Sequence, residues 1–300
     1  MIEVRHIYRK MTSSGWRYWE ARAECGALLR GRSAESVRRE LGSYAMPSSG
    51  YAKTMIVDKL NEWYATKGRL DTARRYEERG GFTIGPSNLG DCSRKLAFLL
   101  SGIEPLPLEP HSVRTFELGH QRGEALERAC KEIWPDAESQ VPIQIPVGKY
   151  TMHGTCDLWI PSLRTVVDFK TQAVYGFTLL DQEGPSLDYQ LQIHAYRHGI
   201  GSYLRSIKCI IIYEAKDSDV RKGVKGQELK EVEVPWSDEL EETYQGRLRM
   251  LELMLRQRET NTLNPSAYPE LPVGKNGQHS WKCRFCSIGE ERGSCYKNVS

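Results

Sequence analysis

The stretch Val166-Val167-Asp168-Phe169-Lys170 is the most informative part of this 300-residue chain, together with His153-Gly154-Thr155-Cys156-Asp157 just before it. Residues i and i+2 of a β-strand point to the same face, so Asp168 and Lys170 should project together. A hairpin between the two stretches would bring Asp157 close to both. Two carboxylates and an ammonium form an oxygen-rich site suited to Mg²⁺ or Mn²⁺, ions that lower the pKa of bound water.

The sequence offers further groups for such a site. The carbonyl of Phe169 is a possible metal ligand. An expected helix over 112–134 places His120, Glu124 and Glu127 at i, i+4 and i+7, on one face. The alternatives are a surface hairpin with an Asp–Lys ion pair, and a solvated charged face on the helix.

The order of the expected elements predicts a mixed α/β core with a mixed central sheet. Two prolines predict an edge strand at 141–146, and a continuous apolar run predicts a buried central strand at 209–213. The other expected strands cover 150–160, 164–171 and 228–234, and the expected helices cover 87–99, 112–134, 186–199 and 237–258.

The first 80 residues read as a separate, basic and helical segment. They hold 16 Lys and Arg against 10 Asp and Glu. We expect helices over 12–41, 54–66 and 70–79, and a domain boundary at Gly80-Gly81. The predicted domains are therefore 1–82 and 83–300. The excess positive charge suits either a nucleic-acid-binding arm or a solvated helical face.

Three of the eight cysteines lie in the last 18 residues, as Cys283, Cys286 and Cys295. Cys92 is the candidate for a fourth ligand. Four thiolates can hold a [4Fe–4S] cluster or Zn²⁺, and the number of ligands does not separate the two. The remaining cysteines read as small buried hydrophobic residues: Cys25, Cys130, Cys156 and Cys209.

Composition excludes several classes of protein. Hydrophobic residues make up 39% and charged residues 27%, which allows a sizeable core and argues against wholesale disorder. The chain has no apolar run of about 18 residues, so we expect no transmembrane helix. The N-terminus has no apolar segment typical of a secretory signal, which makes the cytoplasm the expected compartment.

The chain resembles the RecB-like branch of the PD-(D/E)xK nuclease superfamily. Three motifs match, as Gly154/Asp157, Asp168/Lys170 and Gln192/Tyr196. The resemblance implies a restriction-endonuclease-like core in which Asp157 and Asp168 bind metal and Lys170 assists hydrolysis. It also implies that Gln192 and Tyr196 lie near the site, where they contact DNA or order the lysine.

The family's first motif is a glycine followed four residues later by a histidine, and this chain differs from it. Counting from Gly119 gives Gly123, and counting from Gly123 gives Glu127, as in relatives that use a glutamate. We expect this helix to supply a metal ligand and take His120 and Glu124 as the candidates.

Over about residues 85–300 the chain is similar to RecB-like exonucleases of the CRISPR-associated iron–sulfur type, which include many bacteriophage proteins. That resemblance implies a [4Fe–4S] cluster on Cys92, Cys283, Cys286 and Cys295. It further implies a metal-dependent DNA exonuclease in recombination, repair or processing, acting on single-stranded DNA or DNA ends. A recombination or annealing protein would be a further partner, and the host cytoplasm the location of a phage-encoded protein.

The segment 36–60 resembles the SAP-type DNA-binding module, with Pro47, Ser49, Gly50, Lys53 and Ile56 in matching places. Its cationic side chains would then contact phosphates: Arg38, Arg39 and Lys53. The alternative is a helical hairpin that caps the body.

Two other functions stay open at this point. One is a non-catalytic DNA-binding protein that retains the nuclease fold and the cluster. The other is a zinc-stabilised endonuclease of restriction or resolvase type.

Overall fold

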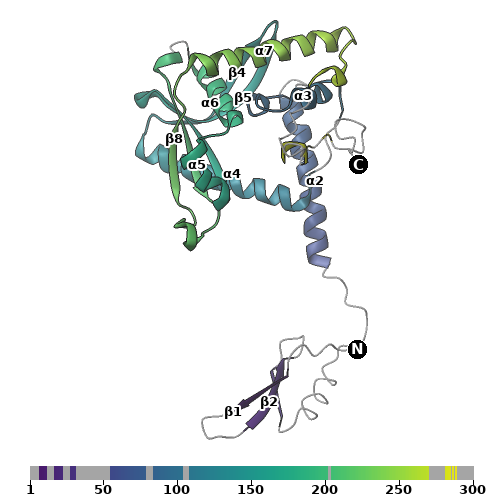
Figure 1. Cartoon of the computed structure of the whole chain (residues 1–300), viewed down its shortest axis with the longest axis vertical. Coiled ribbons are helices and arrows are strands. Elements are labelled where there is room, and N and C mark those ends of the chain that lie inside the picture. Colours follow the sequence, from purple (N-terminus) through teal and green to yellow (C-terminus); the bar gives the residue numbers. More distant parts are fainter. Residues whose placement is uncertain are drawn as a thin grey trace. The chain divides into compact units, whose positions relative to one another are not determined.

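The structure of the chain is a computed structural model, and it divides into two compact units, Met1–Leu60 and Asn61–Ser300 (Figure 1). It describes residues 7–11, 17–22, 28–31, 55–78, 84–103, 108–201, 204–269, 281–284, 286 and 288. The boundary predicted at Gly80-Gly81 lies outside the described residues. No described helix is long and apolar enough to cross a membrane.

The first unit contains a three-stranded antiparallel sheet of β1 (Ile7–Met11), β2 (Arg17–Arg22) and β3 (Leu28–Gly31). The predicted helix over 12–41 is therefore wrong at 17–22 and 28–31. Its many Arg, Ala, Glu and Leu residues favour a helix, but Tyr18 and Trp19 favour a strand, and pairing with two neighbours decides the outcome.

One continuous helix, α2 (Met55–Glu78), replaces the two helices predicted over 54–66 and 70–79. Gly68 lies inside it. A Cβ atom at this position would be 2.9 Å from Cγ2 of Val113, so the glycine allows a close approach between two helices. Tertiary packing thus compensates for the low helix propensity of glycine.

The second unit contains a five-stranded mixed sheet in the order β4-β5-β6-β7-β8. Strands β6 and β7 are parallel, and the other neighbours are antiparallel. The mixed α/β core, the edge position of β4 and the inner position of β7 agree with the sequence predictions. The strands are β4 (Glu138–Val147), β5 (Tyr150–Ile160), β6 (Thr165–Gln172), β7 (Lys208–Ala215) and β8 (Leu229–Glu233).

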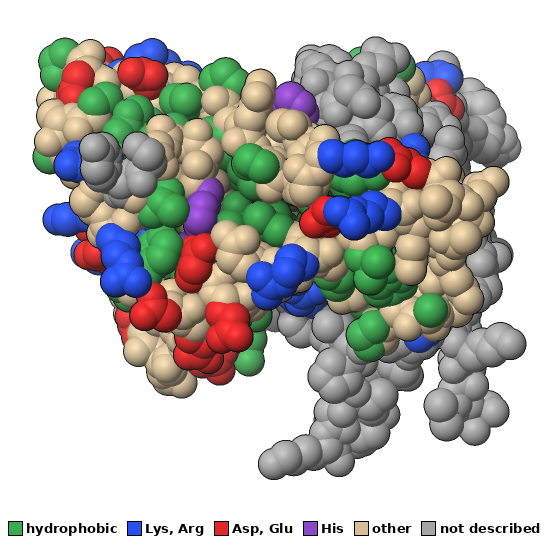
Figure 2. All heavy atoms as spheres, turned by 90° about the horizontal axis from the view of Figure 1, so that it is seen from above, with side chains coloured by type: hydrophobic (Ala, Val, Ile, Leu, Met, Phe, Trp, Pro, Cys, Tyr) green, Lys and Arg blue, Asp and Glu red, His purple; other side chains and the backbone are tan. Residues whose placement is uncertain are grey.

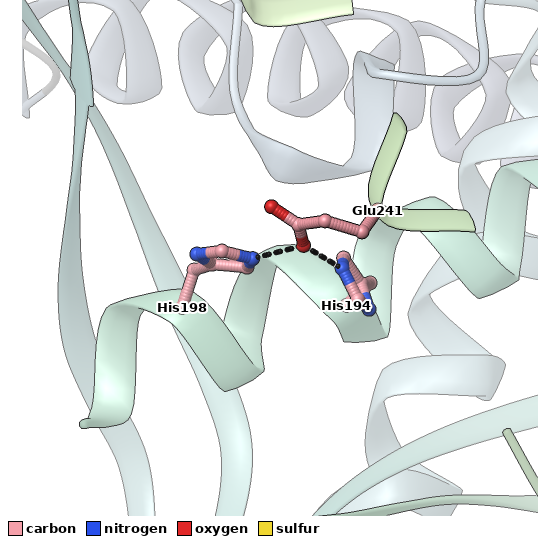
Figure 3. A group of neighbouring side chains, drawn as sticks. All are labelled: His194, His198 and Glu241. Carbon is pink, nitrogen blue, oxygen red and sulfur yellow. Dashed lines mark hydrogen bonds and ion pairs between the residues drawn. The ribbon is translucent and has the colours of Figure 1, made fainter. Parts of the chain in front are cut away.

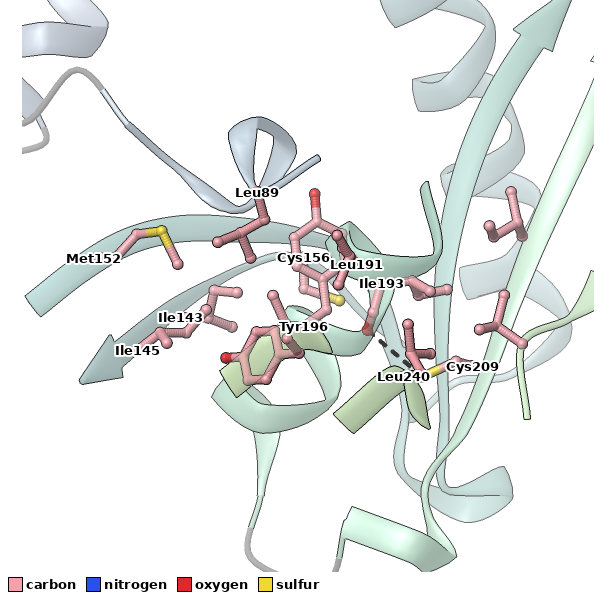
Figure 4. Close-up of a cluster of buried hydrophobic side chains, with 14 of the residues drawn as sticks. Leu89, Ile143, Ile145, Met152, Cys156, Leu191, Ile193, Tyr196, Cys209 and Leu240 are labelled. Atoms are coloured by element: carbon pink, nitrogen blue, oxygen red, sulfur yellow. Dashed lines mark hydrogen bonds between the residues drawn. The ribbon is translucent and has the colours of Figure 1, made fainter. Parts of the chain in front are cut away.

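Helices cover both faces of this sheet. On one face α6 (Leu187–Ile200) packs across four strands and against α7 (Asp238–Glu259). Figure 4 shows this core, where side chains from the two helices meet those of β4, β5 and β7. On the other face, a smaller core forms beneath the C-terminal end of α4 (Pro110–Ile133). Both predicted long helices, over 112–134 and 237–258, are confirmed.

Two local predictions differ from the structure. The helix expected from Ser87 is instead a short turn (Pro86–Asn88) followed by α3 (Ser93–Leu100), which begins after Cys92. Gly90 separates them, where a Cβ atom would be 2.5 Å from Cα of Asp188. Helix α5 (Val174–Glu183) was not among the helices predicted from the sequence. A short helix, α8 (Trp281–Arg284), follows near the C-terminus.

Candidate functional site

The predicted hairpin of β5 and β6 ends where the candidate site begins. The ladder ends on this side with the pair of Leu158 and Val167, and Asp157 and Asp168 are the next residues on each strand. Beyond this pair, the backbone N–H of Phe169 donates to Oδ2 of Asp157 at 3.1 Å. The diverging strands therefore bring both aspartates to one place, as the sequence predicts.

Asp168 is the centre of this group and is fully buried. Nζ of Lys170 lies 2.9 Å from its Oδ1 and 2.7 Å from its Oδ2. The amide of Gln192 on α6 donates to Oδ1 at 3.1 Å, and the same nitrogen lies 2.6 Å from the hydroxyl of Tyr196. Four of the residues named from the sequence thus share one hydrogen-bonded network with Asp157 beside it.

Burial raises the pKa of Asp168 to about 7, and the charge of Asp157 adds to this effect while Lys170 opposes it. Burial also raises the pKa of Asp157, against the opposing effects of Lys170 and the Phe169 N–H. For Lys170, burial lowers the pKa, but the two carboxylates outweigh it, and the net pKa is raised. One ammonium therefore faces more buried carboxylate than it can neutralise.

Glu127 is the residue of α4 that joins this group. It is buried, whereas His120 and Glu124 are exposed. Its charge contributes to the raised pKa of Asp157, and burial raises its own pKa. The structure thus places Glu127, rather than the two candidates chosen from the sequence, within electrostatic reach of Asp157.

Two glycines of the sequence motifs allow close packing around the site. A Cβ atom at Gly154 would lie 2.5 Å from Cγ of Pro86, so the proline ring packs directly against β5. A Cβ atom at Gly119 would lie 3.2 Å from Oγ1 of Thr171, where α4 approaches β6. These glycines position the elements that carry the carboxylates.

The donor set fits a hard divalent cation. Oδ2 of Asp168 is buried and lacks a well-aligned hydrogen-bond donor, although Lys170 lies close to it. Asp157 lies beside Asp168, and the charge of Glu127 acts on Asp157; carboxylate oxygens of this kind suit Mg²⁺ and Mn²⁺. A bound cation would offset the burial and, secondarily, the mutual repulsion that raise the pKa values of these groups. The Phe169 carbonyl stays a prediction.

Sequence reasoning did not single out two residues that support this group. The ring centroid of Tyr189 lies 5.2 Å from Nζ of Lys170. Gln140, on the edge strand β4, donates from Nε2 to Oε1 of Glu127 at 2.7 Å. Tyr189 lies one helical turn before Gln192, and this spacing is the sequence signal that could have pointed to Tyr189. No comparable sequence signal points to Gln140.

The described cysteines of the predicted cluster lie in neighbouring segments. Cys92 precedes the first turn of α3, and its Sγ lies 3.9 Å from the carbonyl oxygen of Pro269. Cys283 and Cys286 belong to one turn, in which the Cys286 N–H donates to the Cys283 carbonyl at 3.2 Å. Asp188 connects the two regions, because it lies against Gly90 and pairs with Lys282.

Other predicted residues lie outside the described part of the chain: Cys295 and the proposed phosphate contacts Arg38, Arg39 and Lys53. Over the described residues of the face seen in Figure 2, Lys and Arg side chains are interspersed with Asp and Glu. That face shows no broad surface of one charge sign. Cys156 and Cys209 are buried, as predicted, while Cys130 is half-buried.

A second polar cluster joins α6 to α7 on the other side of α6 (Figure 3). Oε2 of Glu241 lies 2.7 Å from Nε2 of His194 and 2.8 Å from Nε2 of His198, and the potential ligand atoms of these three residues lie within 4.8 Å of one another. Arg197 lies 3.2 Å from Nδ1 of His194. An arginine only donates, so the proton of a neutral His194 lies on Nε2 and is donated to Glu241.

The buried Arg197 makes this cluster a hydrogen-bonded clamp rather than a metal site. Arg197 is only 1% exposed, and Glu241 balances its charge through His194. A divalent cation here would meet both a nearby positive charge and a protonated Nε2. Burial lowers the pKa of His194 to about 4, which keeps the ring neutral at ordinary pH.

Comparison with known proteins finds only distant structural similarity. No family model and no curated protein matches the chain. The crystal structure of SSO0001 is similar with a TM-score of 0.40 and 17% identity, over 68% of this chain and 83% of that one. A phage related exonuclease from Haemophilus somnus 129PT is similar with a TM-score of 0.38 and 14% identity, over 56% and 81%. Both similarities are too low to assign the chain to a family.

Proposed function

We propose that this protein is a metal-dependent nuclease. The observation that carries the proposal is the meeting of Asp157, Asp168 and Lys170 where β5 and β6 diverge, with the charge of the buried Glu127 acting on Asp157. Three carboxylates and one lysine in a buried site match the needs of phosphodiester hydrolysis, in which a cation activates water and offsets phosphate charge.

The residues divide into ligands and positioning groups. Asp168, Asp157 and Glu127 would hold the cation, which would supply an activated water and polarise the phosphate. Lys170 would orient the water or offset phosphate charge. Gln192 fixes Asp168 through a 3.1 Å hydrogen bond and is itself held beside Tyr196.

The finer assignment rests on the sequence resemblance. Under this assignment the protein would be a Mg²⁺- or Mn²⁺-dependent DNA exonuclease in recombination, repair or processing. DNA, single-stranded or with free ends, would be the substrate. The basic segment before α2 would add phosphate contacts, and a recombination or annealing protein would be a further partner.

Replacement of a central ligand tests the activity. We expect Asp168→Ala to abolish Mg²⁺- or Mn²⁺-dependent cleavage of end-labelled single- and double-stranded DNA, because the buried carboxylate that binds the cation is lost. Asp136→Ala is the matched control, since Asp136 hydrogen-bonds Ser162 away from the site. Full cleavage by Asp168→Ala would contradict the proposal. DNA binding without cleavage by the wild-type protein would favour the non-catalytic alternative.

We further propose that Cys92, Cys283, Cys286 and Cys295 hold a structural [4Fe–4S] cluster. The proximity of the segments around Gly90 and Lys282, which both lie against Asp188, supports this assignment for the described cysteines. A cluster bound by residues this far apart in sequence would close a long loop and stabilise the fold.

The cluster predicts a colour and a stability effect. Anaerobically purified protein should absorb at about 400 nm, as iron–sulfur proteins do. The Cys286→Ala variant should lose this absorbance, its iron and part of its thermal stability. Cys130→Ala, which changes a cysteine beside the smaller core, should retain the iron. Stoichiometric zinc in place of iron would favour the zinc-stabilised alternative.

A further inference from the structure

Gln140 has an unusual backbone conformation for a residue inside a strand. Its φ angle is 54°, in the left-handed region that residues with a side chain rarely adopt. Gln140 also interrupts the β4–β5 ladder, because Ser139 pairs with Leu158 and Val141 with Cys156 while Gln140 itself is not paired in the ladder. The residue opposite Gln140 in this register is Asp157.

The left-handed turn at Gln140 reverses the face that β4 presents. In a regular strand Ser139 and Val141 would share one face, and Gln140 would point to the other. Here Ser139 lies 3.5 Å from Lys131 of α4, and Gln140 also reaches α4, through Glu127. Val141 instead packs against the core beneath α6. Two consecutive side chains therefore reach the helix that carries Glu127.

The hydrogen bond to Glu127 is short and well placed. Nε2 of Gln140 donates to Oε1 at 2.7 Å, and Glu127 is only 7% exposed. An amide fixes a carboxylate without neutralising its charge, whereas a lysine in the same place would compete with a cation. Strained backbone that persists beside a functional group often has a role in positioning that group.

We propose that Gln140 is a positioning residue that holds the Glu127 carboxylate in place for the metal ion. The inference rests on the proposed function, in which Glu127 is a metal ligand. It assigns a purpose to the left-handed conformation, because that conformation turns the amide toward α4 opposite Asp157.

The test is the affinity of the full-length protein for Mn²⁺, measured without DNA from the electron paramagnetic resonance signal of the free ion. Gln140→Gly removes the amide but tolerates the left-handed φ, so it separates the side chain from backbone strain. We expect it to weaken Mn²⁺ binding by about tenfold or more, as is typical for the loss of groups that orient a ligand. Its thermal midpoint should stay close to that of the wild type.

Three further variants complete the experiment. Gln140→Asn also tolerates the left-handed region, but its amide is one methylene shorter, so it should weaken binding in the same way. Gln257→Ala removes a glutamine side chain on α7 that accepts a hydrogen bond from Tyr268 at 2.8 Å, and it should leave Mn²⁺ affinity unchanged. Glu127→Ala should weaken Mn²⁺ binding. The double variant with Glu127→Ala and Gln140→Gly should bind Mn²⁺ as weakly as Glu127→Ala alone, because both changes act through the same carboxylate.

The outcomes separate the two proposals. If Glu127→Ala weakens Mn²⁺ binding but Gln140→Gly and Gln140→Asn bind as tightly as the wild type, the role of Gln140 is wrong and the metal site stands. If Glu127→Ala also binds as tightly as the wild type, Glu127 is not a ligand and this part of the proposed function fails. A loss of affinity in the double variant beyond that of Glu127→Ala would show that Gln140 acts on another ligand.

Discussion

Lys170 combines two opposing effects on the candidate site. Its ammonium lies within 2.9 Å of both oxygens of Asp168, so it stabilises a buried carboxylate. The same positive charge repels a divalent cation that approaches those oxygens. A lysine that served structure alone would be dispensable for chemistry, whereas a lysine that orients water or offsets phosphate charge would not.

Replacement of Lys170 by methionine separates these effects. We expect Lys170→Met to bind Mn²⁺ several-fold more tightly, because the competing positive charge is gone. We expect it to cleave DNA at least about 100-fold more slowly, because a positioned polar group is lost. Mn²⁺ titration and single-turnover cleavage at saturating metal measure the two quantities. If Lys170→Met cleaves DNA at the wild-type rate at saturating metal, Lys170 has no part in the reaction.

Helix α6 carries different chemistry on its two sides. Gln192 and Tyr196 belong to the network around Asp168, while His194 and His198 bond to Glu241 on α7. Residues two apart on a helix differ by about 200°, which explains this separation. Because the Glu241 clamp fixes α6 to α7, it also fixes the helix that positions the Asp168 carboxylate.

The clamp makes the folded state sensitive to acid. The pKa of His194 falls from 6.5 to about 4 on folding, so below pH 6.5 the unfolded chain binds a proton that the folded chain does not. Stability is therefore lost as pH falls from 6.5 toward 4, by about 2 kcal/mol at pH 5 for this group. For Glu241, burial alone would raise the pKa, but hydrogen bonds from His194, Gln245 and His198 lower it to about 2, which adds a further loss below pH 4.5.

Urea unfolding at pH 7 and pH 5 measures this effect. His194→Gln preserves a donor toward Glu241 and an acceptor for Arg197 but does not titrate, so its unfolding free energy should fall less on acidification. The difference from the wild type should be about 2 kcal/mol. His198→Gln retains His194 and should behave like the wild type. Equal pH dependence in all three proteins would show that His194 is not held neutral by the fold.

At the scale of the whole molecule, the later part of α2 belongs with the second unit. Asn61 accepts a hydrogen bond from Arg114 of α4 at 2.8 Å, and the same guanidinium lies 5.2 Å from the ring centroid of Tyr64. Val113 packs at Gly68. A truncation at residue 80 would therefore remove a helix that contacts α4, whereas a truncation before Met55 would retain it.

Two truncated chains test this division. We expect residues 55–300 to keep the thermal midpoint of the full chain, and residues 81–300 to unfold at a lower temperature because the contacts with α4 are lost. Residues 1–54 hold 10 Lys and Arg against 5 Asp and Glu, so their removal should also weaken DNA binding and flatten its salt dependence. Cleavage by 55–300 at saturating enzyme should persist. Unchanged affinity and salt slope would show that the segment does not bind DNA.

The sequence by itself determined the local pattern of the second unit and most of its candidate site. The family resemblance pointed to Gln192 and Tyr196. Alternation on β6 placed Asp168 and Lys170 on one face, and the expected hairpin brought Asp157 close to both. Such periodic patterns report which residues share a face, because the geometry of strands and helices is fixed. The pattern was less reliable in the first unit, where strands replaced a predicted helix over the described residues.

Only the tertiary structure decided which residue of α4 faces the carboxylates and what holds it there. His120, Glu124 and Glu127 share a helical stripe, and the choice of Glu127 depends on how closely α4 approaches β6 at Gly119. The left-handed turn at Gln140 and the clamp between His194 and Glu241 likewise join residues far apart in sequence. Local propensity does not encode such contacts, because they arise when the elements pack together.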